Sequence, residues 1–351
     1  SGEEYSSNSI SLLSSHLIKD PVDSAKLTSV PDRTEQFYIL VNDDGNIAVF
    51  LSQRNEKIAG WMQWNTDGDY TSVCCTTSDI YVATKRSINS VDKYSLEQFS
   101  DHAFDLPTDY TVSKTISASY QPHGSPLTNG AFSSATTFTA DGFTNAPSVG
   151  ETFQFGGAGT TFTINSVTAT GVSGEYTIVI NTASSQSDGV ALQFVTSKVF
   201  SGLTTHIGKT VFATSGTNED SAVFYYGTGT VSSGGAVSFQ TAASAVDIGL
   251  DFTVEIDTLS PDATGRAGQL TGLPRKIAKT ILELSTTYNL TVNSNDVVLT
   301  TTSINTSDGL DSFTGKKEIY PLGYSIEPNL QIGQSVPLPM RVLGITTEVY
   351  F

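Results

Sequence analysis

The histidines are the first side chains to test for chemistry, because an imidazole can bind a metal or move a proton near neutral pH. The chain has four of them, His16, His102, His123 and His206. None lies at metal-ligand spacing from a second histidine or from a cysteine. We therefore predict that all four are structural or surface residues.

Two aspartate-rich turns could hold calcium, because carboxylate and carbonyl oxygens are its ligands. They are residues 42–46 (NDDGN) and 67–69 (DGD). The glycine falls one place too early for an EF-hand, and the distant glutamate is missing. Asp-Gly between apolar runs is instead the strongest short-range hairpin signal, because glycine accepts a positive φ without steric cost. We predict two hairpin turns and no metal site.

Paired carboxylates are the remaining candidates, since glycoside hydrolysis needs two of them facing each other across a cleft. Acids are frequent, for example Asp251, Glu255, Asp257 and Asp262, but no spacing selects two of them. The chain also has no Gly-x-Ser-x-Gly elbow, P-loop or dinucleotide fingerprint, and the glycines of 156–159 precede no helix. The predicted site therefore contains no catalytic, cofactor-binding or metal-binding residue, and we expect a protein that is not an enzyme and uses no cofactor.

Composition indicates an all-β protein. Of 351 residues only 15% are charged, while threonine, which favours strands, and glycine and serine, which favour turns, are abundant. The net charge of −17 and the pI of about 4.4 disfavour binding to nucleic acid, whose phosphates are held mainly by Lys and Arg. The cysteines Cys74 and Cys75 are adjacent and point to opposite faces of a strand, so no disulfide is expected. No signal peptide and no apolar run long enough to span a membrane is visible.

The chain is organised around residues 37–86, which predict a meander of short antiparallel strands resembling a propeller blade. Trp61, Trp64 and Tyr70 lie in this meander; they could stack on a sugar, but packing in a core is the favoured interpretation. Trp61 and Trp64 have opposite strand parity, so they should face different sides. The predicted strands of the meander are 37–41, 47–51, 59–64, 70–76 and 80–84.

The fold class we predict is all-β, with antiparallel meander or propeller-like and β-sandwich-like domains and a small inserted β module. The domains are residues 1–120, the propeller-like part; 124–197, a Thr/Gly-rich inserted module; and 198–351, the continuation with a C-terminal strand. A short helix is predicted within 6–18, and 277–284 is ambiguous between helix and strand. Further strands are predicted at 135–140, 152–155, 160–167, 175–181, 191–195, 209–215, 221–227, 251–256, 292–301 and 337–349, with a hairpin at 231–239.

Six segments in this order resemble the tail nozzle proteins of short-tailed bacteriophages, also called tail tubular protein B. No single segment is specific, but the series extends over nearly the whole chain. The segments are 11–17 (SLLSSHL), 41–45 (VNDDG), 52–61 (SQRNEKIAGW), 66–73 (TDGDYTSV), 80–86 (IYVATKR) and 337–345 (PLPMRVLGI).

The resemblance implies a structural virion protein that forms a homohexameric ring in the tail, below an adaptor protein and in contact with tail fibres. The ring is the channel for DNA ejection, so double-stranded DNA passes without specific binding. Family members are longer, so this chain corresponds to their C-terminal part. The tail is expected to assemble in the host cytoplasm, and no membrane span is expected. The resemblance also implies that 277–284 is a strand. Residues 124–197 resemble the small β insertions of some members, similar to the first catalytic-cysteine half-domain of ubiquitin-activating enzymes, with no catalytic role.

Two hypotheses from other classes remain open. One is a carbohydrate-binding or receptor-binding tail protein with 124–197 as the adhesin, which predicts exposed aromatic side chains on that module. The other is a tail-associated glycan hydrolase, which predicts two carboxylates converging in a cleft.

Overall fold

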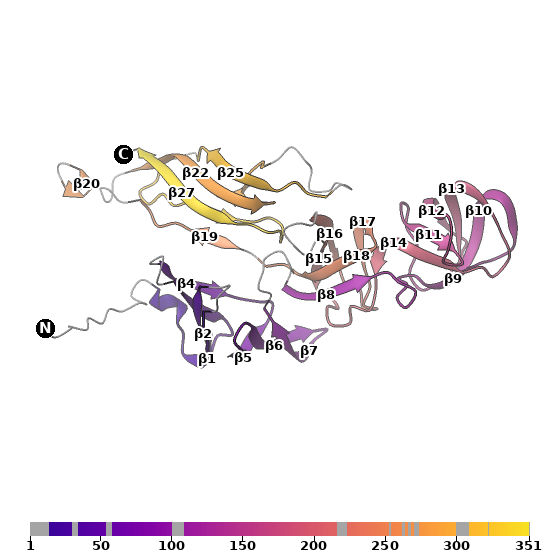
Figure 1. Ribbon diagram of the computed structural model, residues 1–351, viewed down its shortest axis with the longest axis horizontal. Helices are drawn as coiled ribbons and strands as arrows, with labels where there is room; N and C mark the ends of the chain where they lie inside the picture. The colour runs from indigo at the N-terminus through magenta and orange to yellow at the C-terminus, as the bar shows by residue number, and fades with distance from the viewer. Residues whose placement is uncertain are drawn as a thin grey trace. The chain divides into compact units, whose positions relative to one another are not determined.

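A computed structural model describes residues 14–29, 34–53, 58–99, 109–215, 223–252, 254–261, 264–265, 268–269, 274–299, 309–321 and 323–350 (Figure 1). Apart from one 3-10 turn, η1 (Ser15–Leu17), all regular structure in these ranges is β-strand in antiparallel sheets. The predicted all-β class is confirmed. The chain divides into two compact units, residues 1–102 and 103–351.

Two sheets of consecutive strands share one core in the first unit. The four-stranded sheet has the order β1-β2-β3-β4, and the three-stranded sheet has the order β5-β6-β7. Buried Ile39, Val49, Val73 and Val82 belong to the core between them. The strands are β1 (Pro21–Leu27), β2 (Gln36–Asn42), β3 (Ile47–Gln53), β4 (Ile58–Trp64), β5 (Asp69–Cys75), β6 (Ile80–Ile88) and β7 (Val91–Gln98).

The two aspartate-rich turns have different roles. The 42–46 turn is the predicted hairpin between β2 and β3, with Gly45 at φ 79°. The 67–69 turn is not a hairpin, because β4 pairs with β3 whereas β5 pairs with β6. Here the chain passes from one sheet to the other, and the Asp-Gly signal reports only the local backbone, not the pairing of the flanking strands.

Gly68 is required at this crossover. Its φ is 138°, and a Cβ would collide with the backbone carbonyl of Lys85 and lie 2.8 Å from Cγ of Arg86. We expect Gly68→Ala to destabilise the first unit by about 1–3 kcal/mol, because it adds backbone strain to the collision. Gly60→Ala is the control, since no atom lies within 4 Å of a Cβ there; urea unfolding should show it neutral or slightly stabilised, and equal losses in the two variants would contradict the expectation.

Residues 124–197 contribute most of a seven-stranded sheet in the second unit, with the order β17-β14-β11-β12-β13-β10-β9. The sheet curls, because Leu127 of β9 forms a bridge to Ala191 next to β14 (Figure 1). Its core is aromatic, and β14 continues past Ser197 to pair with β17. The strands are β9 (Gly124–Thr128), β10 (Phe132–Phe143), β11 (Thr152–Phe155), β12 (Thr161–Ala169), β13 (Tyr176–Gln186), β14 (Leu192–Phe200) and β17 (Val237–Ala243).

A four-stranded sheet, β16-β15-β18-β8, encloses a second core around Phe200, Val211 and Ile248. The hairpin predicted at 231–239 is wrong in its pairing: Ser232 and Ala236 close a turn, but β16 pairs with β15 and β17 with β14. The strands are β8 (Asp109–Thr115), β15 (Thr210–Ser215), β16 (Phe224–Thr230) and β18 (Ala245–Leu250).

Two further sheets share a core of Leu282, Leu284, Leu330 and Ile332. One has the order β25-β22-β27, drawn side by side in Figure 1, and the other β19-β26-β23-β24. We call this pair the C-terminal sandwich. Its strands are β19 (Glu255–Asp257), β22 (Lys276–Thr287), β23 (Thr291–Val292), β24 (Asn295–Asp296), β25 (Phe313–Ile319), β26 (Gln331–Gly333) and β27 (Val342–Tyr350); the two-residue strands β20 (Thr264–Gly265) and β21 (Gly268–Gln269) pair with each other.

The structure decides four sequence predictions in this region. Residues 277–284 lie in β22 and form a strand, as the family resemblance implies. The continuous strand predicted at 292–301 is wrong over its described part, because Asn293 and Ser294 have φ of 49° and 62° and turn the chain back. The strands predicted at 251–256 and 337–349 are shorter than expected, since β19 begins at Glu255 and β27 at Val342.

The remaining differences are strands that the sequence analysis did not predict. They include β1, β7, β9, β18, β25 and β26, and β8 was assigned to a linker. Of the helix predicted within 6–18, the described part begins at Ser14 and contains only η1. The predicted domain boundaries at 120, 124 and 197 stay predictions.

Candidate functional site

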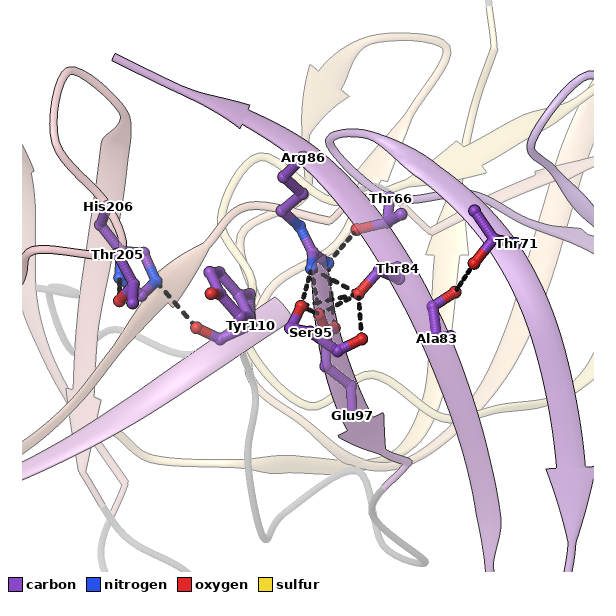
Figure 2. Close-up of polar contacts among 10 residues, drawn as sticks. All are labelled: Thr66, Thr71, Ala83, Thr84, Arg86, Ser95, Glu97, Tyr110, Thr205 and His206. Carbon is purple, nitrogen blue, oxygen red and sulfur yellow. Dashed lines mark hydrogen bonds and ion pairs between the residues drawn. The ribbon is translucent and has the colours of Figure 1, made fainter. Parts of the chain in front are cut away.

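A buried polar cluster in the first unit surrounds Arg86, which is 2% exposed. The guanidinium forms an ion pair with both carboxylate oxygens of Glu97, one of them at 3.0 Å from Nη2. It also donates to Thr66 Oγ1 at 2.6 Å and to Thr84 Oγ1 at 2.9 Å, and Ser95 Oγ donates to Glu97 (Figure 2). Strands β6 and β7 therefore meet through an ion pair on the buried face of their sheet.

Glu97 remains ionised in this cluster. Burial raises the pKa of Glu97, but hydrogen bonds from Arg86, Ser95 and Thr84 outweigh burial and hold that pKa below its usual value. A general acid or base needs a pKa near the working pH. The paired carboxylate is far from that condition, so the cluster serves packing and strand register.

A second cluster combines residue types found in hydrolases. His123, Glu151 and Ser197 have no exposed surface. His123 Nε2 lies 3.0 Å from Glu151 Oε2 and 3.0 Å from Ser197 Oγ, and Ser197 Oγ donates to Glu151 Oε1 at 3.0 Å. The side chains come from the segment before β9, the residue before β11, and β14, so they tie both ends of residues 124–197 together.

The arrangement differs from a nucleophilic triad. In a triad the carboxylate orients the imidazole from the nitrogen opposite the serine. Here Glu151 and Ser197 share Nε2, while Nδ1 faces the carbonyl of Asn145 at 3.0 Å. Ser197 also bonds to the backbone of Val199, and no part of the cluster reaches solvent. This geometry does not fit acyl transfer. We call the cluster of His123, Glu151 and Ser197 a structural lock, because it joins the two ends of residues 124–197.

Glu151 is the centre of this lock. It accepts backbone N–H bonds from Ser148 and Lys198, each at 2.7 Å. Burial raises the pKa of Glu151, but the hydrogen bond and charge of His123, with the two amides, outweigh burial and lower that pKa overall. The carboxylate is thus held ionised at neutral pH.

The other histidines are placed separately. His206 is buried, with Nε2 2.8 Å from the carbonyl of Tyr110 and Nδ1 3.0 Å from Thr205 Oγ1, and its ring stacks on Tyr110 at 4.8 Å (Figure 2). His16 is exposed in η1, and His102 lies outside the described residues. In the described parts of the chain, no three His, Cys, Asp or Glu side chains are grouped to hold a metal.

Of the acids considered for hydrolysis, Asp251 follows β18, and Glu255 and Asp257 lie on β19. Glu255 and Asp257 are exposed, and Asp262 lies outside the described residues. Burial raises the pKa of Asp251, and it raises the pKa of Asp247, whose carboxylate accepts from Ser113 Oγ at 2.5 Å. Asp247 was not considered from the sequence; it is 7% exposed on β18, and its burial within the sheet points to a structural role.

The tryptophans lie on opposite sides of β4, as their parity predicts. Trp64 contacts Phe37 and Phe99 on the core side, with ring centroids 6.5 and 4.8 Å apart, whereas Trp61 lies 5.1 Å from Phe50 on the other face. Both are half-buried. Neither Cys74 nor Cys75 is part of a disulfide.

Comparison with models of known protein families and with curated proteins gave no match. No helix in the described ranges is long and apolar enough to cross a membrane.

Proposed function

We propose that this chain is a structural subunit of the tail nozzle of a short-tailed bacteriophage, where copies form a ring around the channel for DNA ejection. The observation that carries the proposal is the ordered series of nozzle-like segments. Residues 41–45, 66–73 and 80–86 fall on the β2–β3 turn, the start of β5 and β6. These segments build the core and the crossover of the first unit, so the resemblance concerns the scaffold.

The electrostatics support the same function. The chain has 18 Lys and Arg against 35 Asp and Glu. A wall with this balance repels phosphate and lets DNA pass, because affinity for DNA backbone comes mainly from cationic side chains. The buried titratable clusters are paired internally, which suits a scaffold.

The adhesin hypothesis lacks the feature it predicts. Residues 124–197 contain eight aromatic side chains. All of them pack in or against the module core: Phe132, Phe138, Phe143, Phe153, Phe155, Phe162, Tyr176 and Phe194. None is therefore an exposed platform for a sugar ring.

Electron microscopy of the complete protein tests the proposal. We expect ring particles of six copies in negative stain at high concentration, since a ring pairs exposed sheet edges with neighbours. Monomers alone under these conditions would contradict the proposal.

A further inference from the structure

A groove opens at one end of the C-terminal sandwich, between the β23–β24 turn and the end of β25. Its volume is about 500 Å³, and Val292 and Ile319 contribute apolar surface from the two sheets. A smaller hollow of about 170 Å³ continues the groove, since Asn293 and Pro321 line both. Together they have the size of a small-molecule or oligosaccharide site.

Two exposed tyrosines flank Pro321 along the groove. Tyr320 lines the larger part and is 62% exposed; Tyr324 lines the smaller part and is 67% exposed. The Tyr320 hydroxyl donates to Glu318 at 2.9 Å. Next to Tyr324, Ser325 makes two backbone hydrogen bonds of 2.7 and 2.9 Å with buried Arg275. Both ring-bearing segments are therefore held in place before a ligand arrives, which lowers the entropic cost of binding.

Amides and carboxylates line the groove between the rings. Asn295 donates to the carbonyl of Asn293 at 2.9 Å, which orients both residues of the turn. Asp296, Glu318 and Glu327 are the charged lining residues. Two lysines lie beside the groove: Lys279 pairs with Glu318 at 2.6 Å, and Lys276 Nζ lies 5.9 Å from the ring of Tyr324. The carboxylates of Asp296 and Glu327 leave the groove weakly acidic, which disfavours phosphorylated, sulfated or carboxylated ligands. Amides and carboxylates offer donors and acceptors that match hydroxyl groups.

We propose that this groove binds a neutral oligosaccharide. A sugar ring has an apolar C–H face and a rim of hydroxyls. Its face stacks on Tyr320 and on the side of Tyr324 opposite Lys276, while the rim bonds to the amides and carboxylates. This site lies outside residues 124–197 and does not depend on ring assembly. A negative result for glycan binding would therefore leave the proposed nozzle function unaffected, and the reverse also holds.

A glycan array tests the proposal with the full chain as the labelled probe. The array carries neutral hexose and N-acetylhexosamine oligosaccharides beside sialylated and sulfated ones. We expect binding to neutral members, weakened at least about tenfold by Tyr320→Ala and by Tyr324→Ala, which corresponds to about 1.4 kcal/mol. Tyr320→Phe should retain binding, because it keeps the stacking face.

Tyr350→Ala is the matched control. Tyr350 is 55% exposed, and its hydroxyl also donates at 2.9 Å to a glutamate two residues earlier, Glu348, but it does not line the groove. Circular dichroism of each variant verifies folding, which removal of an exposed ring should leave intact. The proposal is overturned if no neutral glycan binds at millimolar concentration, if acidic glycans bind better, or if Tyr350→Ala weakens binding equally. Tyrosine-dependent retention of polylysine without glycan binding would assign the groove to a basic protein partner and also overturn it.

Discussion

Replacing Arg86 by methionine is expected to lower the unfolding free energy of the first unit by about 2–4 kcal/mol, because it leaves the carboxylate of Glu97, whose side chain is only 17% exposed, without its cation. Hydroxyls of Thr84 and Ser95 would remain near this carboxylate. They cannot replace a guanidinium that forms an ion pair and several hydrogen bonds at once.

Urea unfolding followed by tryptophan fluorescence measures this effect selectively. The chain has two tryptophans, Trp61 and Trp64, and both lie in the first unit. The control is Lys85→Met, one residue earlier on the same strand. Lys85 pairs with Asp92 at 3.0 Å, but the two side chains are 35% and 55% exposed. An exposed pair contributes at most about 1 kcal/mol, so equal losses in the two variants would contradict the account.

A double variant keeps the test decisive if Arg86→Met folds poorly. Arg86→Met with Glu97→Leu removes both charges, and replacing a buried pair by apolar residues is far less destabilising than breaking it. We expect the double variant to recover a large part of the stability lost in the single variant. An additive loss would show that Arg86 and Glu97 are not coupled.

Glu151→Gln is expected to destabilise the seven-stranded sheet by about 2–4 kcal/mol at neutral pH, because the new amide turns an NH2 group toward buried donors that the carboxylate accepts from, the Ser197 hydroxyl and two backbone amides. Hydrogen exchange measured by mass spectrometry should show faster exchange in β11, β12 and β14 and no change in β2 to β6. Glu175→Gln is the control in the same module. Glu175 accepts from Thr170 and Asn129, each at 2.5 Å, at the surface. Matching exchange in the two variants would contradict a lock at Glu151.

The pH dependence of the same lock has a definite sign. The folded pKa of Glu151 lies below its unfolded value, which is about 4.3 for a glutamate. Its contribution is therefore present above the unfolded pKa and lost as the pH falls through the folded pKa. The stability of the sheet in the native protein should fall across this acidic window, and Glu151→Gln should have a shallower fall. An unchanged slope would assign the acid sensitivity to other groups.

Local patterns predicted strands well where apolar residues dominate, as in the continuous runs of β2 and β3 and the alternating β11. They failed at two polar strands: β1 (PVDSAKL) and β8 (DYTVSKT) have few apolar residues and are stabilised by their neighbours in the sheet. They also missed β18 (AVDIGL), which is buried between β15 and β8. Local sequence signals also did not predict which strands pair with each other. The turn at 67–69 was predicted as a hairpin like that at 42–46, although the strands on either side of it pair in different sheets.

Part of the polar interior could have been found from the sequence. Arg86 has the parity of Ile80, Val82 and Ile88 in β6, so alternation places it on the buried face, where a charge requires a partner. The partner is not implied by any spacing, because Glu97 lies across a hairpin. His123, Glu151 and Ser197 are far apart in the chain and meet only through the topology of the curled sheet. A lone glutamate beside an apolar strand, in a stretch without Lys or Arg, was the available signal.

The nozzle function is tested most directly by a cryo-electron microscopy map of the intact virion tail that contains this chain. The account predicts six copies around the tail axis, with the sheets of the first unit fitted into the channel wall below the adaptor ring. A map that places the chain on a peripheral spike or fibre, away from the channel, would contradict it.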